Sequence, residues 1–188
     1  AYQSLKDEVQ KSLELTHPNI TRIYDLVDVS GETPFISMEY LQGEDLHVKM
    51  GKQAGRHFSW KEIEPYMLGL CDALEYAHEQ GMVHRDLKPA NLIITDSGEL
   101  KLTDMGIAEP AKDAGEMLDQ EDFVSGTPHY WSPQQSQAIK PQATDDIYSL
   151  GTTLYHLLTG RPPFLGDNEE EITRQHLAKT PEDLQQVL

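Results

Sequence analysis

The segment of residues 84–104 constrains the fold of this chain more than any other. It opens with His-Arg-Asp-Leu-Lys-Pro-Ala-Asn, which places several polar side chains on one short loop. Two apolar runs, Leu92–Ile94 and Leu100–Leu102, flank an Asp-Ser-Gly turn, and this pattern predicts a β-hairpin. Such a hairpin returns Asn91 and Asp104 to the same end, where their oxygens face one spot.

The oxygens of Asn91 and Asp104 are suited to a hard divalent cation such as Mg²⁺, which shares its coordination with phosphate. We therefore expect a magnesium site at this end of the hairpin. In the loop before it, Asp86 can act as a base and Lys88 as a short-range cation. The alternative is that Asp86 and Asp104 are turn-forming residues without a chemical role.

The loop, followed by Asp104-Met105-Gly106, resembles the catalytic loop and metal-binding motif of the Ser/Thr protein kinases of eukaryotic (Hanks) type. The resemblance is to the bacterial members of that family. Lys88, two positions after Asp86, is typical of the Ser/Thr form. An isolated His-Arg-Asp triplet would mean little, because short motifs recur by chance. The whole loop with Asp-Met-Gly at the right distance is far more specific.

Periodicity and turn signals predict the other elements. Residues 2–15 have helical spacing, and the β-branched and aromatic runs 20–29 and 34–41 predict a pair of strands. Residues 43–53 are expected to form a short helix. A capping box at Ser59 opens a long helix that ends at Gly81. Further helices are expected at residues 144–159 and 167–178.

The resemblance covers nearly all of the chain and implies an α+β, protein-kinase-like fold. Residues 1–41 would form a partial N-lobe with helix C, two strands and the hinge, and residues 42–188 a mainly helical C-lobe, truncated at its C-terminal end. The Gly-rich loop and strand-borne lysine that precede helix C in the family are not in this sequence. We therefore expect the chain to be a fragment that is inactive as given.

The resemblance implies a nucleotide site for ATP around the hinge. The backbones of Glu39 and Leu41 would meet adenine, with Met38 as the gatekeeper residue. Asp45 would meet the ribose, and Ile93 would lie beneath the adenine ring.

The resemblance also implies roles in phosphoryl transfer. Asp86 would accept the proton of the substrate hydroxyl, and Lys88 would steady the transferring group. Asn91 and Asp104 would hold Mg²⁺ and so contact the nucleotide. Thr127 would bridge Asp86 and Lys88, although a plain turn residue also fits its position.

Other positions of the family pattern concern support and regulation. Glu8 falls at the helix C glutamate, and Asp146 would hold the catalytic loop by its backbone. The family's Ala-Pro-Glu is Ser132-Pro133-Gln134 here, so a charged residue is replaced by an amide. Residues 107–123 contain no Ser, Thr or Tyr. Asp119 and Glu121 stand about where similar bacterial kinases carry phosphorylated threonines, and so predict activity without phosphorylation of this segment, although a solvated acidic loop also fits these residues.

Residues outside these motifs are expected to be structural. His78 and His156 lie in apolar helix patterns and predict packed or surface histidines. Cys71 lies in an apolar helix and is expected to pack.

Composition limits the partners. The net charge is −17, with 32 acidic residues against 15 Lys and Arg, and the basic residues form no cluster. This argues against nucleic acid or an anionic membrane as the main partner. ATP and a protein substrate are the partners that the resemblance implies, and the negative charge would repel ATP unless Mg²⁺ and local donors overcame it. One cysteine allows no intrachain disulfide and fits a reducing compartment, so we expect a cytoplasmic kinase domain, whose parent protein could carry a membrane segment elsewhere.

Three functions fit the sequence. The first is a Ser/Thr kinase fragment that transfers the γ-phosphoryl group of ATP to a protein hydroxyl. The second is a pseudokinase, a scaffold without transfer activity, and the third is a metal- or phosphate-binding domain. Asp86, Lys88, Asn91 and Asp104 occur together, which favours the kinase because a scaffold needs no such set.

Overall fold

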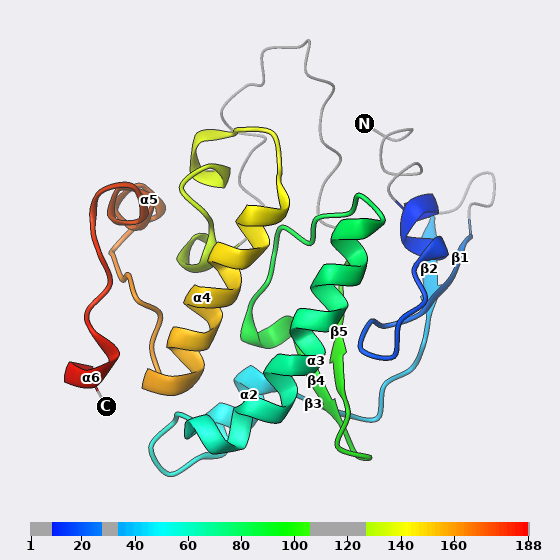
Figure 1. The fold of residues 1–188 in the computed structure, drawn as a ribbon, viewed down its shortest axis with the longest axis horizontal. Coiled ribbons are helices and arrows are strands. Elements are labelled where there is room, and N and C mark those ends of the chain that lie inside the picture. The colour runs from blue at the N-terminus through cyan, green and yellow to red at the C-terminus, as the bar shows by residue number, and fades with distance from the viewer. Residues whose placement is uncertain (1–8, 28–33, 106–126, 188) are drawn as a thin grey trace.

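The chain folds into two small antiparallel sheets beside a helical body (Figure 1). The computed structural model describes residues 9–27, 34–105 and 127–187. The first sheet pairs β1 (Ile23–Val27) with β2 (Phe35–Met38), and these strands lie within the predicted ranges. The mixed architecture confirms the α+β class that the sequence predicts.

The second sheet contains the predicted hairpin. Its strand order is β3 (Gly43–Asp45), β4 (Leu92–Thr95), β5 (Leu100–Leu102), with neighbours antiparallel. Gly98 in the turn has φ 86°, which is the left-handed conformation that glycine adopts without strain. The segment that precedes β1 contacts β5 through an isolated parallel bridge between Ile20 and Leu102.

The predicted helix at residues 43–53 is only partly correct, because its first three residues form β3 and only α2 (Leu46–Lys52) is helical. A side chain on Gly43 would lie 2.3 Å from the carbonyl oxygen of Ile94, so its glycine permits close pairing with β4. Asp45 then accepts a hydrogen bond from the backbone N–H of Val48 at 2.8 Å and caps the helix. Strand β3 could not be predicted from hydrophobic periodicity because it has only three residues.

The three main helices follow the predicted ranges. They are α3 (Trp60–Glu79), α4 (Ala143–Thr159) and α5 (Glu169–Ala178). The capping box at the start of α3 is present, with the Ser59 backbone N–H donating to Glu62 at 2.8 Å. The other short elements are η1 (Pro89–Asn91), η3 (Pro128–Tyr130), η4 (Gln135–Gln137) and α6 (Leu184–Val187). Residues 9–14, which lie inside the predicted range 2–15, are also helical.

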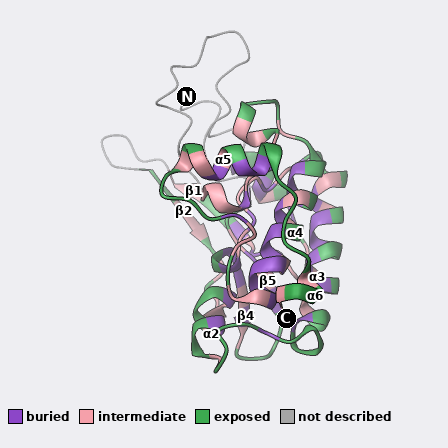
Figure 2. Cartoon of the chain, turned by 90° about the vertical axis from the view of Figure 1, so that its left-hand side faces the viewer, coloured by how far each residue is buried: buried purple, intermediate pink, exposed green. Residues whose placement is uncertain are grey.

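The hydrophobic core lies between α3, the second sheet and α4. Figure 2 shows the buried residues gathered in the centre of the molecule, with exposed residues around them. The apolar stripe of α3 is buried as predicted, from Ile63 through Leu70 to Ala77. Leu87, Leu92 and Leu102 join the same core, so the segment of residues 84–104 is anchored on both sides of its polar loop.

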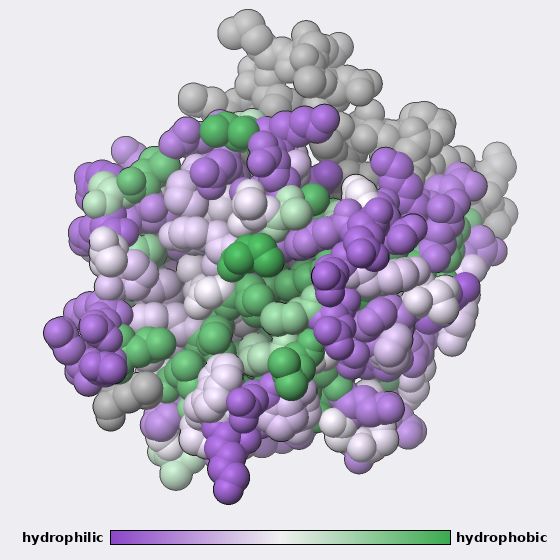
Figure 3. Space-filling model, viewed as in Figure 1, coloured by the Kyte–Doolittle hydropathy of each residue, from purple (hydrophilic) through white to green (hydrophobic). Residues whose placement is uncertain are grey.

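The outer face of α3 and α4 is partly apolar. Figure 3 shows an apolar patch in the middle of this face. A groove between the two helices is lined by Cys71, Leu74, Glu75, His78, Glu79, Ile147 and Leu150. Cys71 is thus exposed rather than packed inside. In the part of the chain that the structure describes, no helix combines the length and apolarity that a membrane span requires.

Candidate active site

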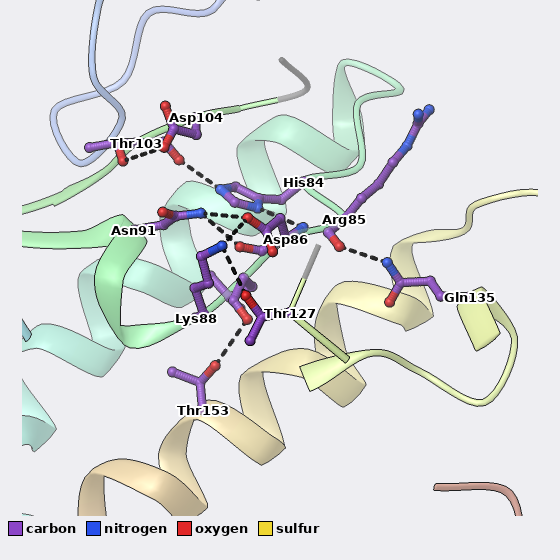
Figure 4. Close-up of polar contacts among 11 residues, drawn as sticks. His84, Arg85, Asp86, Lys88, Asn91, Thr103, Asp104, Thr127, Gln135 and Thr153 are labelled. Carbon is purple, nitrogen blue, oxygen red and sulfur yellow. Dashed lines mark hydrogen bonds and ion pairs between the residues drawn. The ribbon is translucent and has the colours of Figure 1, made fainter. Parts of the chain in front are cut away.

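The loop from His84 to Asn91 joins α3 to β4 and is fixed by buried apolar and polar contacts. Leu87 has no exposed surface, and its carbonyl accepts a hydrogen bond from Thr153 of α4 at 3.2 Å. His84 is also fully buried, and its Nε2 lies 2.8 Å from the carbonyl oxygen of Thr103. The loop is therefore held by α4 on one side and by the end of β5 on the other (Figure 4).

Asp146 in the first turn of α4 holds the start of the loop by its backbone, as the resemblance implies. Its carboxylate accepts the N–H of His84 at 2.8 Å and the N–H of Arg85 at 2.9 Å. Arg85 has φ 71°, a left-handed backbone conformation that is unfavourable for residues other than glycine. The buried carboxylate stabilises that conformation and so sets the direction in which Asp86 leaves the loop.

His78 has a role that its place in an apolar helix did not predict. Its Nε2 lies 2.7 Å from Oδ2 of Asp146, so the last turn of α3 supports the same carboxylate. The apolar periodicity of α3 gave no sign of this bond, because the partner comes from α4, 68 residues later. His78 thus supports the loop through its bond to Asp146, in addition to its partly buried position on α3.

The carboxylate of Asp86 is surrounded by two donors from its own loop. Lys88 Nζ lies 2.6 Å from Oδ2, and Asn91 Nδ2 donates to the same oxygen at 3.2 Å and to the Asp86 carbonyl at 2.8 Å. Lys88 also donates to Thr127 Oγ1 at 3.2 Å. The resemblance places Thr127 between Asp86 and Lys88, whereas in the structure Lys88 is the central residue of the three (Figure 4).

Asn91 and Asp104 come together at the end of the hairpin. Their segments are joined by the Thr103 N–H, which donates to the Asn91 carbonyl at 3.0 Å. Asn91 is buried and its amide nitrogen is directed to Asp86, which leaves the amide oxygen on the side of Asp104 (Figure 4). Asp104 is exposed and has φ 59°, so its carboxylate leaves the strand end in a direction that extended backbone would not give.

These two residues fit a magnesium ion by the chemistry of their oxygens. Within residues 9–27, 34–105 and 127–187, no three His, Cys, Asp or Glu side chains meet in a way that could hold a metal. Mg²⁺, however, is usually bound through one or two carboxylates together with substrate phosphates and water. Asn91 and Asp104 therefore fit a cation shared with a bound phosphate better than an ion held by the protein alone.

The residues expected around the nucleotide lie on and beside the second sheet. Asp45 is paired with Ile93, and Ile93 with Lys101, so the three side chains share one face of the sheet. Lys101 Nζ lies 2.9 Å from Oε1 of Glu39. The sheet is thus tied to the segment that includes Leu41, which is half-buried.

Glu39 is fixed in both its backbone and its side chain. Its N–H donates to the Arg22 carbonyl at 2.7 Å, and its carboxylate accepts the Arg22 N–H at 3.1 Å. Burial favours the protonated carboxyl, but the bonds from Lys101 and Arg22 outweigh it and lower the pKa of Glu39. Met38, the expected gatekeeper, is 40% exposed.

The turn after Thr127 rests on two tyrosine–histidine pairs that sequence reasoning did not identify. Tyr130 Oη lies 2.7 Å from Nδ1 of His156, and Tyr148 Oη lies 2.8 Å from Nδ1 of His176. Burial lowers the pKa of each histidine to about 4 and raises the pKa of each tyrosine. Each pair is therefore a hydrogen bond between a neutral imidazole ring and an uncharged tyrosine hydroxyl. Neither bond can be inferred from periodicity, since each joins separate elements.

Several expectations concern residues that the structure does not describe. Glu8, the expected helix C glutamate, and the acids Asp119 and Glu121 of the acidic segment lie outside the described residues.

Comparison with known proteins identifies the family of this loop. The family model for the protein kinase domain matches residues 1–187. A probable serine/threonine-protein kinase of Streptomyces coelicolor is 38% identical over 182 residues, which cover 93% of this chain and 26% of the relative. The serine/threonine-protein kinases PknB of Mycolicibacterium smegmatis and Mycobacterium tuberculosis are each 37% identical, with coverage of 96% of this chain and 29% of the relative. The chain thus spans less than a third of the length of these relatives.

Proposed function

Because the chain belongs to the protein kinase family, we propose that it is catalytic-domain sequence of a Ser/Thr protein kinase, which transfers the γ-phosphoryl group of ATP to a hydroxyl of a protein substrate. The observation that carries the proposal is the position of the Asp86 carboxylate, whose Oδ2 lies 2.6 Å from Lys88 Nζ. The loop that carries both residues is held by Asp146 of α4. The names of the relatives support the Ser/Thr class.

In this proposal Asp86 acts as the base. Lys88 and Asn91 both contact Oδ2, so Oδ1 is the oxygen that we expect to accept the hydrogen bond of the substrate hydroxyl. The carboxylate orients that hydroxyl and takes its proton as the hydroxyl oxygen attacks the γ-phosphorus, while the bond from that phosphorus to the β–γ bridging oxygen breaks and ADP leaves. Lys88 brings a positive charge to the place where negative charge moves during transfer. Thr127 restrains Lys88 through the hydrogen bond to its ammonium group.

The nucleotide would occupy the side of the second sheet that faces the hinge. We expect the backbones of Glu39 and Leu41 to meet adenine, Asp45 to meet the ribose, and Ile93 to lie under the base. Asn91 and Asp104 would hold Mg²⁺, which neutralises charge on the phosphates. Asp45 already caps α2 through Oδ1, so its second oxygen is the one free for a ribose hydroxyl.

The same proposal extends to partners and location. A protein substrate is the partner that membership of the kinase family implies. The 32 acidic residues against 15 Lys and Arg disfavour nucleic acid as a partner. A single free cysteine suits a reducing environment, which supports a cytoplasmic kinase domain.

The test is transfer of labelled γ-phosphate from ATP by the full-length protein, to itself and to a general acceptor such as casein, followed by identification of the phosphorylated amino acid. We expect Mg²⁺-dependent label on Ser and Thr. Binding of Mg-ATP without any transfer would point instead to a pseudokinase. Absence of both binding and transfer would leave the third hypothesis, a domain without kinase chemistry.

A further inference from the structure

The peptide bond between Arg85 and Asp86 is held from outside the loop. On one side Asp146 accepts the Arg85 N–H at 2.9 Å. On the other side Gln135 Nε2 donates to the Arg85 carbonyl at 2.6 Å (Figure 4). This carbonyl belongs to the peptide unit that also contains the backbone nitrogen of Asp86, so Gln135 contacts the residue that carries the proposed base through its own peptide group.

The orientation of the Gln135 amide is fixed by its second contact. Its Oε1 accepts the backbone N–H of Ser132 at 3.0 Å, so the nitrogen end must face Arg85. The Ser132 hydroxyl in turn accepts the Gln135 N–H at 3.0 Å. Ser132 and Gln135 thus bond each other reciprocally, and a side chain held in this way has little freedom to leave the Arg85 carbonyl.

A second buried aspartate anchors this pair to α4. The Ser132 hydroxyl donates to Asp145 Oδ1 at 2.5 Å, and Asp145 Oδ2 accepts the Gln142 N–H at 2.8 Å. Asp145 and Asp146 are 1% and 0% exposed, and both lie in the first turn of α4, where the helix dipole favours negative charge. Adjacent carboxylates therefore hold Arg85 by two routes, Asp146 directly and Asp145 through Ser132 and Gln135.

We propose that Gln135 is a positioning residue for Asp86 and couples the segment of residues 127–135, which we expect to face the protein substrate, to the catalytic loop. This inference rests on the proposed function. Gln135 lies in η4, at the end of the segment whose first residue, Thr127, contacts Lys88. A shift of this segment moves the donor at the Arg85 carbonyl and hence the direction of the Asp86 side chain. The position of the Asp86 carboxylate therefore depends on the position of this segment.

The sharpest variant is Gln135→Glu. A glutamate keeps the acceptor for the Ser132 N–H but puts an oxygen against the Arg85 carbonyl, where the native amide donates. Gln137→Glu is the matched control, because it makes the same change on the same short helix at an exposed position.

In the full-length protein we expect Gln135→Glu to lower kcat by about 10- to 100-fold, since small misplacement of a reacting group has effects of that size. The KM for ATP should stay within about 2-fold, because the nucleotide contacts lie elsewhere. Gln137→Glu should match the wild type. In an Asp86→Asn background, Gln135→Glu should lower kcat no further, since it acts through Asp86.

A second measurement is independent of activity. Amide hydrogen exchange at Arg85 and Asp86 should accelerate at least about 10-fold in Gln135→Glu and in Ser132→Ala, but not in Gln137→Glu, because only the first two variants release the loop. Unchanged exchange at these amides, or a wild-type kcat in Gln135→Glu while Asp86→Asn is inactive, would overturn the inference alone. A wild-type rate in Asp86→Asn would instead overturn the proposed function, and the exchange result would still decide whether Gln135 holds the loop.

Discussion

Asp146 accepts the backbone N–H of Arg85 at 2.9 Å, although 61 residues separate the two in sequence. The same carboxylate contacts the His84 N–H and the His78 ring, so three donors from α3 and the loop meet one fully buried side chain of α4. The loop is thus shaped by a side chain of α4 that has no exposed surface. Arg85 keeps an unfavourable left-handed backbone because this contact stabilises it.

Asp146→Ala should therefore destabilise the fold strongly. The substitution leaves two backbone N–H groups and the His78 ring without their acceptor, and we expect the free energy of unfolding to fall by about 2–5 kcal/mol. Urea denaturation of the polypeptide of residues 1–188 measures this. Asp72→Ala on the exposed side of α3 is the control and should change stability by less than about 0.5 kcal/mol. Equal stability of the two variants would contradict the role of Asp146.

Asp86→Asn should remove phosphoryl transfer without loss of the fold. An amide cannot take the proton of the substrate hydroxyl, and loss of a general base costs about 10²- to 10⁴-fold in rate. Steady-state kinetics of the full-length protein, with circular dichroism to monitor folding, tests this. Asp96→Asn in the exposed hairpin turn should keep the wild-type rate. Turnover by Asp86→Asn near that rate would show that Asp86 is not the base.

Asp104→Ala should weaken nucleotide binding only when Mg²⁺ is present. The side chain is exposed, so its removal should leave stability nearly unchanged while one of the two proposed oxygen ligands is lost. Calorimetric titration of the full-length protein with ATP, with and without Mg²⁺, separates the two effects. Asp72→Ala again serves as the control. If the Mg²⁺ dependence of Asp104→Ala equals that of the wild type, Asp104 is not a ligand.

The sequence predicted the parts of this fold that depend on local pattern. The hairpin of β4 and β5 follows from two apolar runs around Asp-Ser-Gly, and α3 follows from the capping box at Ser59 and its apolar stripe. Strand β3 was missed because three residues are too few for a period. It forms because Gly43 allows close contact with Ile94 of β4, which comes 51 positions later in the chain.

In the candidate site, too, the residues of one local segment were predicted and the contacts between distant segments were not. Asp86, Lys88 and Asn91 were found together because one loop carries them, and Asp104 because a hairpin has a predictable length. The supporting contacts of His78 and Gln135 come from elements far along the chain, and no local pattern marks them. A glutamine that bonds a carbonyl looks, in sequence, like any other polar residue of a turn. The tyrosine–histidine pairs escape for the same reason.

Those pairs predict how stability depends on pH. Burial, with the nearby His47 and His129, lowers the pKa of His156 to about 4, and burial chiefly lowers that of His176 to about 4. In the unfolded chain both have a pKa near 6.5. Between these values the unfolded chain binds more protons than the folded chain. The contribution of the two neutral histidines to the free energy of unfolding is therefore fully present above about pH 6.5 and is lost as the pH falls toward 4.

The double variant His156→Gln and His176→Gln should flatten this dependence. A glutamine oxygen can still accept the Tyr130 or Tyr148 hydroxyl, but it does not titrate. Urea midpoints of the polypeptide of residues 1–188, measured from pH 7 to pH 4.5, should fall less steeply in the double variant than in the wild type. His57→Gln, at an exposed position, should keep the wild-type slope. A double variant that loses stability on acidification as steeply as the wild type would place the titrating groups elsewhere.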